Sequence, residues 1–232
     1  MTPKIYAHRG ASEHAPENTM AAFQLAMDQH ADGIELDAML SGDGDVVVIH
    51  DDTVDRTTNG SGRVREMIVE QLQSLDAGSG ERIPTLVEVF EQFGGKFLIN
   101  IELKNYATIF DALPLKVAKL INTYGLVDSV LISSFNPFNF KRIRRLVPDV
   151  TIGLLTQPQK AKFWMWRLFK FNAIHPHFSD VDETLVKALH EKDLQVNVWT
   201  ADDAEEISRL ADMNVDGIIT NCPQRARETL EA

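Results

Sequence analysis

The chain has 232 residues, of which 44% are hydrophobic and 25% charged, and its formal net charge is −11 at pH 7. These fractions are those of an ordinary soluble globular protein, while the acidic balance argues against a nucleic-acid partner and against binding to an anionic membrane surface. The single cysteine, Cys222, excludes an internal disulfide framework and a cysteine zinc cluster, and is typical of the cytoplasm.

In chain order, short β-rich runs alternate with helical patterns. The N-terminus lacks the basic and apolar segments of a signal peptide, and no apolar run approaches the roughly 18 residues of a membrane helix. The predicted strands are Lys4–His8, Gly33–Leu40, Val46–His50, Lys96–Lys104, Ser129–Ser134, Thr151–Thr156, Ala173–His177, Leu194–Thr200 and Gly217–Asn221. The predicted helices are Thr19–His30, Leu86–Phe93, Phe110–Tyr124, Pro137–Leu146, Ala161–Phe169, Glu183–Lys192, Ala204–Asp212 and a short one after Pro223. This alternation indicates parallel strands joined by crossover helices.

The number of repeats favours a particular α/β fold. If Gly33–Leu40 and Val46–His50 form one hairpin-like unit, about eight βα repeats remain, which is the size of a (β/α)8 TIM barrel. An open doubly wound sheet is the alternative, but no glycine-rich dinucleotide loop follows the first strand. The segment Asp51–Arg82 is too long for a plain connection and has a possible short helix from Glu66. We therefore expect one domain over residues 1–232, with a small insertion at residues 51–82 after the second strand unit.

Carboxylates occupy strand positions that are usually apolar. In GIELDAML, Glu35 and Asp37 share one face of the strand, and in NIELKN the residues Asn100, Glu102 and Lys104 share one face. Both faces of a parallel barrel strand are covered, so buried carboxylates are costly unless they are paired or bind a cation. A buried salt-bridge network is one interpretation. A site for Mg²⁺ or Ca²⁺ is the better one, since these ions prefer oxygen ligands and the sequence has no zinc-binding pattern.

Two histidines follow apolar runs directly. His8, with Arg9 beside it, closes the first strand, and His50 ends GDVVVIHDD. Each alone could be a solvated or structural histidine. Together, at the carboxyl ends of barrel strands where active sites lie, they can act as a base and an acid near neutral pH.

At these residues the sequence resembles the glycerophosphodiester phosphodiesterase family. The matching pieces run in order from the first strand to the last: HRG, PENT, GIELD, VVIHDDTVDRTTNGSG, LDAG, IPTL, NIELK, SSF, VWT and DGIITNCP. The resemblance implies a TIM barrel with a small inserted segment. It also implies hydrolysis of a glycerophosphodiester to glycerol 3-phosphate and an alcohol.

Carried over residue by residue, the resemblance implies a role for each matching position. His8 and His50 would be the acid–base pair, and Glu35, Asp37 and Glu102 would hold one divalent cation, Mg²⁺ or Ca²⁺. The residues implied to contact substrate or support its site are Arg9, Lys104, Glu17, Asn18, Phe135 and Trp199. As in the related phosphoinositide-specific phospholipases C, the attacking group would be the substrate's own hydroxyl, with water as the alternative. The sequence assigns neither histidine to base or acid.

The sequence also allows other interpretations of the aromatic stretch and of the function. The aromatic stretch KFWMWRLFKF, residues 162–171, is either outer-barrel packing or an exposed apolar lip used for dimerisation or for lysophospholipid chains. The lip would favour phospholipase D-like activity on lysophospholipids. A silent phosphodiester-binding module is poorly supported, because both histidines and all three carboxylates are present. The expected partner is a small glycerophosphodiester in the cytoplasm, with no nucleic acid, no transmembrane segment and a possible homodimer.

Overall fold

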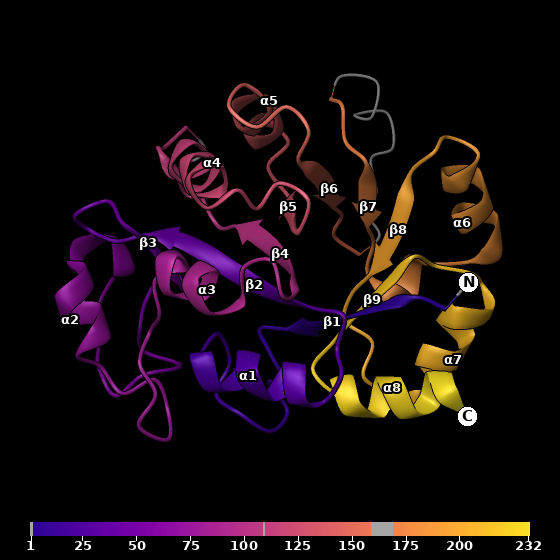
Figure 1. Cartoon of the computed structure of the whole chain (residues 1–232), viewed down its shortest axis with the longest axis horizontal. Coiled ribbons are helices and arrows are strands. Elements are labelled where there is room, and N and C mark those ends of the chain that lie inside the picture. The colour runs from indigo at the N-terminus through magenta and orange to yellow at the C-terminus, as the bar shows by residue number, and fades with distance from the viewer. Residues whose placement is uncertain (1, 109, 159–168) are drawn as a thin grey trace.

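The computed structural model describes residues 2–108, 110–158 and 169–232, and its strands form a closed barrel. Eight of the described strands are parallel, in the order β1-β9-β8-β7-β6-β5-β4-β2, and pairing of β1 with β2 closes the ring, while β3 pairs antiparallel with β2. The bounds are β1 Lys4–His8, β2 Gly33–Leu40, β3 Val46–Val48, β4 Leu98–Leu103, β5 Val130–Ser134, β6 Thr151–Leu155, β7 Ala173–His175, β8 Gln195–Val198 and β9 Gly217–Thr220. Helices surround these strands (Figure 1), which confirms the predicted TIM barrel.

Helices follow most of the strands. Their bounds, with two 3-10 turns, are α1 Met20–Asp28, η1 Val64–Glu66, α2 Val69–Gln73, α3 Leu86–Phe93, α4 Leu113–Tyr124, α5 Phe138–Arg144, η3 Phe178–Asp180, α6 Glu183–His190, α7 Ala204–Asp212 and α8 Pro223–Glu231. A capping box starts α3, because Thr85 and Glu88 each accept a hydrogen bond from the other's backbone N–H. Helix α4 begins at Leu113 and not at the predicted Phe110, since Pro114 favours the first turn of a helix. Most of the predicted helix Ala161–Phe169 lies outside the described residues.

The two faces of the barrel strands carry different chemistry. All of β2 is buried, and its Ile34 and Leu36 pack in the main apolar cluster together with Phe23 of α1. Glu35 and Asp37, which alternate with them, point into the barrel instead. Apolar burial between strands and helices therefore stabilises the fold, while the interior of the barrel is free to carry polar groups.

The segment between β3 and α3 contains η1 and α2 and lies to one side of the barrel (Figure 1). Its Val64 and Leu72 are fully buried in an apolar cluster that also includes Met39 of β2 and Val47 of β3. The helix predicted from Glu66 begins at Val69, after a short 3-10 turn. The β2–β3 hairpin thus provides the apolar surface on which this segment packs.

His175 at the end of β7 is fully buried inside the barrel. Its Nε2 lies 3.1 Å from Asn197 Nδ2, and its backbone oxygen accepts a hydrogen bond from Trp199 Nε1 at 2.8 Å. The ring covers Gly153, where an added Cβ would lie only 2.3 Å from His175 Nε2. Burial lowers the pKa of His175 to about 3, so the ring is neutral in the folded protein at ordinary pH.

We expect acid to destabilise the protein in part through His175. Because a histidine in the unfolded chain binds a proton near pH 6.5, the unfolded state binds more protons than the folded state between pH 6.5 and the lowered folded value. The free energy of unfolding therefore falls as pH is lowered through 6.5, by about 2 kcal/mol from this residue between pH 7 and pH 5. Urea denaturation at both pH values should show a loss smaller by that amount in His175→Gln than in the unmodified protein. An equal loss in the two proteins would contradict the expectation.

Candidate active site

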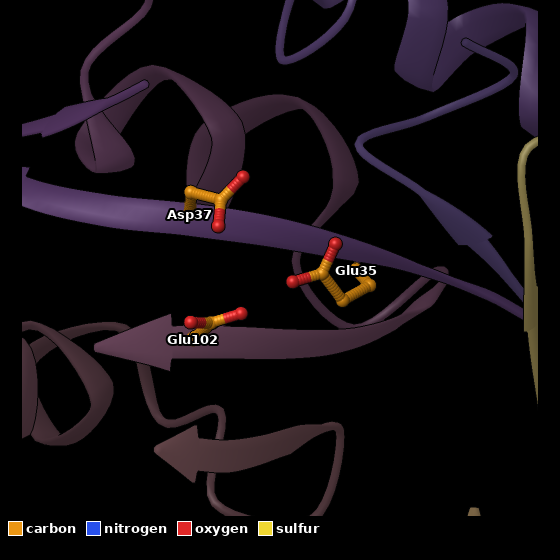
Figure 2. A group of neighbouring side chains, drawn as sticks. All are labelled: Glu35, Asp37 and Glu102. Atoms are coloured by element: carbon orange, nitrogen blue, oxygen red, sulfur yellow. The ribbon is translucent and has the colours of Figure 1, made fainter. Parts of the chain in front are cut away.

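Three carboxylates lie toward the carboxyl ends of two neighbouring barrel strands. Glu35 and Asp37 share the inner face of β2, and the register between β2 and β4 pairs Asp37 with Glu102. All three are buried, and one oxygen from each lies within 4.8 Å of the others. Figure 2 shows the three carboxyl groups facing a common space between the strands. The structure thus brings together the three residues that the sequence suggests as metal ligands.

Two basic side chains partly neutralise these carboxylates. Lys104 Nζ lies 3.1 Å from Glu102 Oε1 and 3.6 Å from Asp37 Oδ1, and Arg9 Nε lies 3.3 Å from Asp37 Oδ2. Burial alone would raise the pKa of Asp37, but the charges of Lys104 and Arg9 hold it below its usual value. The balance at Glu35 is the opposite, since burial, followed by repulsion from Asp37 and Glu102, raises its pKa well above the usual range.

The donor set fits a hard divalent cation. Two half-buried basic groups, Arg9 and Lys104, offset two of the three negative charges, so a salt-bridge network alone favours a neutral Glu35 carboxyl, whereas a bound cation would let all three carboxyls ionise. Three carboxylates offer the oxygen ligands that Mg²⁺ and Ca²⁺ prefer, at a spacing that one ion can bridge. With such an ion, the three carboxylates, Arg9, Lys104 and the ion would together carry a net charge of about +1, which suits a singly charged phosphodiester.

The turn after β1 aims Arg9 at the carboxylates. Arg9 adopts a left-handed φ of 58°, and Gly10 follows with a φ of 83°. A Cβ at Gly10 would lie 2.6 Å from backbone and side-chain atoms of α1, so the close approach requires glycine. Asn18, at the end of the same loop, donates from Nδ2 to Asp37 Oδ2 at 2.8 Å. The HRG and PENT pieces therefore form one structure that holds Arg9 and Asp37 in place.

His8 is oriented by a hydrogen-bonded amide. Its Nδ1 lies 2.7 Å from Asn221 Oδ1, and Asn221 Nδ2 donates to Asp202 Oδ2 at 2.6 Å, which fixes the amide orientation. Because the amide oxygen only accepts, the proton of neutral His8 sits on Nδ1. Its Nε2, 4.0 Å from Glu35 Oε2, keeps the free lone pair. Burial, followed by the charge of Arg9, lowers the pKa of His8 to about 4.

His50 is oriented by a carboxylate instead. It lies two residues past the end of β3, and its Nδ1 is 2.5 Å from Asp51 Oδ1. Hydrogen bonding to Arg56 holds the pKa of Asp51 down to about 2, so this carboxylate is ionised at neutral pH. Arg56 also donates to both Glu17 oxygens at 2.7 Å, and Arg9 donates to Glu17 at 3.0 Å. We call this pair, Arg56 with Glu17, the loop bridge, because it joins the segment after β3 to the loop after β1.

A pocket with a volume of about 170 Å³ opens beside the two histidines. Its lining includes most of the predicted site residues, namely His8, His50, Arg9, Lys104, Glu35, Glu102, Phe135 and Trp199. The rings of Phe135 and Trp199 form an aromatic wall, with centroids 5.8 Å apart. Glu17 and Asp37 stand behind the lining and contact Arg9.

Three residues of the site are absent from the predicted set. Tyr106 donates to Glu102 Oε1 at 2.6 Å, and its ring lies 5.8 Å from that of Phe135. Tyr106 follows Lys104 by two residues, so extending the alternation of NIELK past the strand would have suggested it. Asp51 is adjacent to His50 in sequence. Asn221, in contrast, is 213 residues from His8, and only closure of the barrel brings the two together.

Comparisons with known proteins agree with this geometry. The sequence profile of the Glycerophosphoryl diester phosphodiesterase family matches residues 8–225. A glycerophosphodiester phosphodiesterase of Caldanaerobacter subterraneus subsp. tengcongensis is 42% identical over 97% of this chain and 96% of that protein. An Oleispira antarctica phosphodiesterase, solved with the product sn-glycerol-3-phosphate, superposes with a TM-score of 0.91 at 30% identity, covering 100% of this chain and 98% of the other. A glycerophosphodiester phosphodiesterase of Agrobacterium tumefaciens superposes with a TM-score of 0.86 at 31% identity, covering 97% and 99%.

Within residues 2–108, 110–158 and 169–232, no helix combines the length and apolar character needed to cross a membrane.

Proposed function

This chain belongs to the glycerophosphoryl diester phosphodiesterase family and is a phosphodiester hydrolase, and we propose that it uses a cation-assisted mechanism with two histidines. The reaction converts a glycerophosphodiester and water to sn-glycerol 3-phosphate and an alcohol. The single observation that carries the mechanism is the pocket in which His8, His50 and the carboxylates Glu35 and Glu102 meet.

In this proposal Glu35, Asp37 and Glu102 hold one divalent cation, Mg²⁺ or Ca²⁺. Their mutual distances and burial support the assignment. When bound, such an ion lowers the pKa of a nearby attacking hydroxyl and stabilises charge on the phosphate. Arg9 and Lys104 line the same pocket and contribute positive charge to the phosphate oxygens.

We assign His8 as the general base. In its neutral form Nδ1 is occupied as a donor to Asn221, so Nε2 is the nitrogen that can accept a proton. A neutral amide partner and a half-buried position beside Arg9 both favour the uncharged ring. His8 would take the proton of the attacking oxygen as that oxygen bonds to phosphorus, whether it belongs to the substrate or to water.

We assign His50 as the general acid. An ionised carboxylate accepts the hydrogen bond from Nδ1, so it orients the ring and places a negative charge beside it, unlike the neutral amide beside His8. His50 would give its Nε2 proton to the alcohol oxygen as the bond from that oxygen to phosphorus breaks. When water attacks, the two histidines then exchange protons with solvent to reset the site. When the substrate's own hydroxyl attacks, water then opens the cyclic phosphate: the now neutral His50 takes the proton of the water, and the protonated His8 returns its proton to the glycerol oxygen.

The activity is tested by a release assay for glycerol 3-phosphate. Purified protein with Mg²⁺ or Ca²⁺ is expected to release it from glycerophosphocholine and glycerophosphoethanolamine. Failure to release glycerol 3-phosphate from either substrate with either cation would contradict the proposed activity.

Exposed aromatic rings justify a further arm of that assay. Phe110 and Phe138 are 69% and 49% exposed with centroids 6.0 Å apart, and Phe169 lies 5.5 Å from Phe138. Most of the predicted lip at residues 162–171 lies outside the described residues. A lysophospholipid as substrate, with choline release as the readout, tests the alternative phospholipase D-like activity.

Three further expectations from the sequence stay predictions. These are the limits of the insertion at residues 51–82, a cytoplasmic location and a homodimer.

A further inference from the structure

Two polar side chains at the pocket have atoms without a partner among the described residues. Asn100 is 2% exposed and Ser133 is 1% exposed, and both line the pocket that contains the histidines. Asn100 Oδ1 and Ser133 Oγ are fully covered, yet neither forms a hydrogen bond within the part of the chain that the structure describes. A ligand or solvent in the pocket must therefore supply their partners.

The barrel register places both groups next to the carboxylates. Asn100 pairs with Glu35 across β2 and β4, and Ser133 pairs with Glu102 across β4 and β5. The strand alternation that turns Glu102 into the barrel therefore turns Asn100 inward as well. The two polar groups lie on adjacent strands, next to the groups proposed to act on phosphate.

Both apolar and polar side chains line the pocket around Asn100 and Ser133. Leu155 of β6 and Ile219 of β9 also line the pocket, so apolar and polar groups both contact its contents. An unpaired buried polar group destabilises a fold, and leucine or alanine at these two positions would avoid that penalty. A ligand with hydroxyl and CH groups in this part of the pocket would hydrogen-bond to Asn100 and Ser133 and so offset the cost of burying them.

We propose that Asn100 and Ser133 bind the terminal hydroxyl of the glycerol half of the substrate, the one farthest from phosphate. This inference rests on the proposed function. The volume of about 170 Å³ lies below the roughly 300 to 1,000 Å³ of drug-sized pockets, so the lining suits a short polyol better than a large head group. The glycerol CH groups contact Leu155 and Ile219, and the departing alcohol lies toward the aromatic wall of Phe135 and Trp199.

The direct test compares two substrates that differ by one oxygen. The first is sn-glycero-3-phosphocholine, and the second is its propane-1,2-diol analogue, which has hydrogen in place of the terminal hydroxyl. Both retain the hydroxyl next to the phosphate-bearing carbon. A site that hydrogen-bonds a substrate hydroxyl rejects the analogue without it, so we expect kcat/KM to favour the glycerol substrate roughly 10- to 100-fold.

Substitutions at Asn100 and Ser133 test whether these residues cause the preference for the glycerol substrate. Ser133→Ala and Asn100→Leu are each expected to reduce the preference at least about threefold and, together, to nearly abolish it. Because Ser133 Oγ has no protein partner among the described residues, Ser133→Ala should keep or raise the melting temperature. Ser134→Ala is the matched control: Ser134 is the next residue on β5, faces away from the pocket and bonds to the Leu103 oxygen. It should lower the melting temperature and leave the preference unchanged.

The outcomes separate this inference from the proposed function. If glycerol 3-phosphate is released but the unmodified protein turns over both substrates equally, the inference is wrong and the function stands. If neither substrate is hydrolysed, the function itself fails. If a variant is inactive, its binding affinities for glycerol 3-phosphate and for propane-1,2-diol 1-phosphate are compared in place of turnover. A variant that retains the full binding preference overturns the role of that residue.

Discussion

His50→Ala is expected to lower kcat for glycerophosphocholine by about 10²- to 10⁴-fold, the usual contribution of a general acid or base. Choline is a poor leaving group, so its oxygen needs a proton as the bond to phosphorus breaks. A glycerophosphodiester of p-nitrophenol does not need this proton, because nitrophenol leaves readily as an anion. The same variant should therefore lose much less activity, no more than about tenfold, on the nitrophenyl substrate. Steady-state kinetics on the two substrates measure the difference.

His8→Ala is the matched comparison. If His8 is the base, its loss slows attack on phosphorus whatever group leaves, so both substrates should lose activity to a similar extent. Circular dichroism and melting temperature show whether each variant remains folded. An equal loss on both substrates in His50→Ala, or a selective loss in His8→Ala, would reverse the assignment of acid and base.

Removing the divalent cation is expected to lower turnover by about 10³-fold or more, since a cation of this kind contributes several kcal/mol to transition-state stabilisation. The physical reason lies in the local charge. Without an ion, three buried carboxylates would face the substrate's phosphate, and among the described residues Arg9 and Lys104 are the basic side chains that contact them. Dialysis against excess chelator, followed by addition of Mg²⁺ or Ca²⁺, should abolish and then restore activity. Undiminished turnover in excess chelator would exclude the proposed cation.

A stability measurement checks the same site without relying on catalysis. A cation that binds the folded state raises the melting temperature by mass action, in proportion to its concentration over its dissociation constant. We expect Glu102→Gln to lose most of this rise, because it removes one of the three carboxylates. Glu66→Gln, at an exposed position of η1, should retain it. A rise of equal size in both variants would show that the cation binds elsewhere.

Strand alternation accounts for how much of this molecule is predictable from sequence. In GIELDAML the positions of Glu35 and Asp37 between apolar residues fix both the strand and the face from which the carboxylates project. NIELK repeats the pattern, so three carboxylates at one end of a barrel follow from local sequence and the fold class. Predicted strand ends run slightly long: Val46–His50 ends at Val48, where the chain turns toward the segment that follows.

The unpredicted features depend on contacts between distant segments. Asn221 orients His8 only because β9 pairs with β1, and neither residue's surroundings in sequence indicate the other. Asn100 shares a strand face with Glu102 in the sequence pattern, but its missing partner becomes visible only once the surrounding side chains are in place. The face from which a strand residue projects can be predicted from alternation, whereas contacts between distant segments and unmet hydrogen bonds cannot.

The loop bridge limits how this enzyme can be re-engineered. Arg56 belongs to the segment after β3, while Glu17 belongs to the loop after β1, and each segment adjoins a different one of the two histidines proposed to be catalytic. Exchange of residues 51–82 with those of a relative would leave Glu17 facing a new partner. Arg9, which also bonds to Glu17, would lose part of its support. A chimera that keeps both histidines aligned therefore has to exchange the loop after β1 together with the segment after β3.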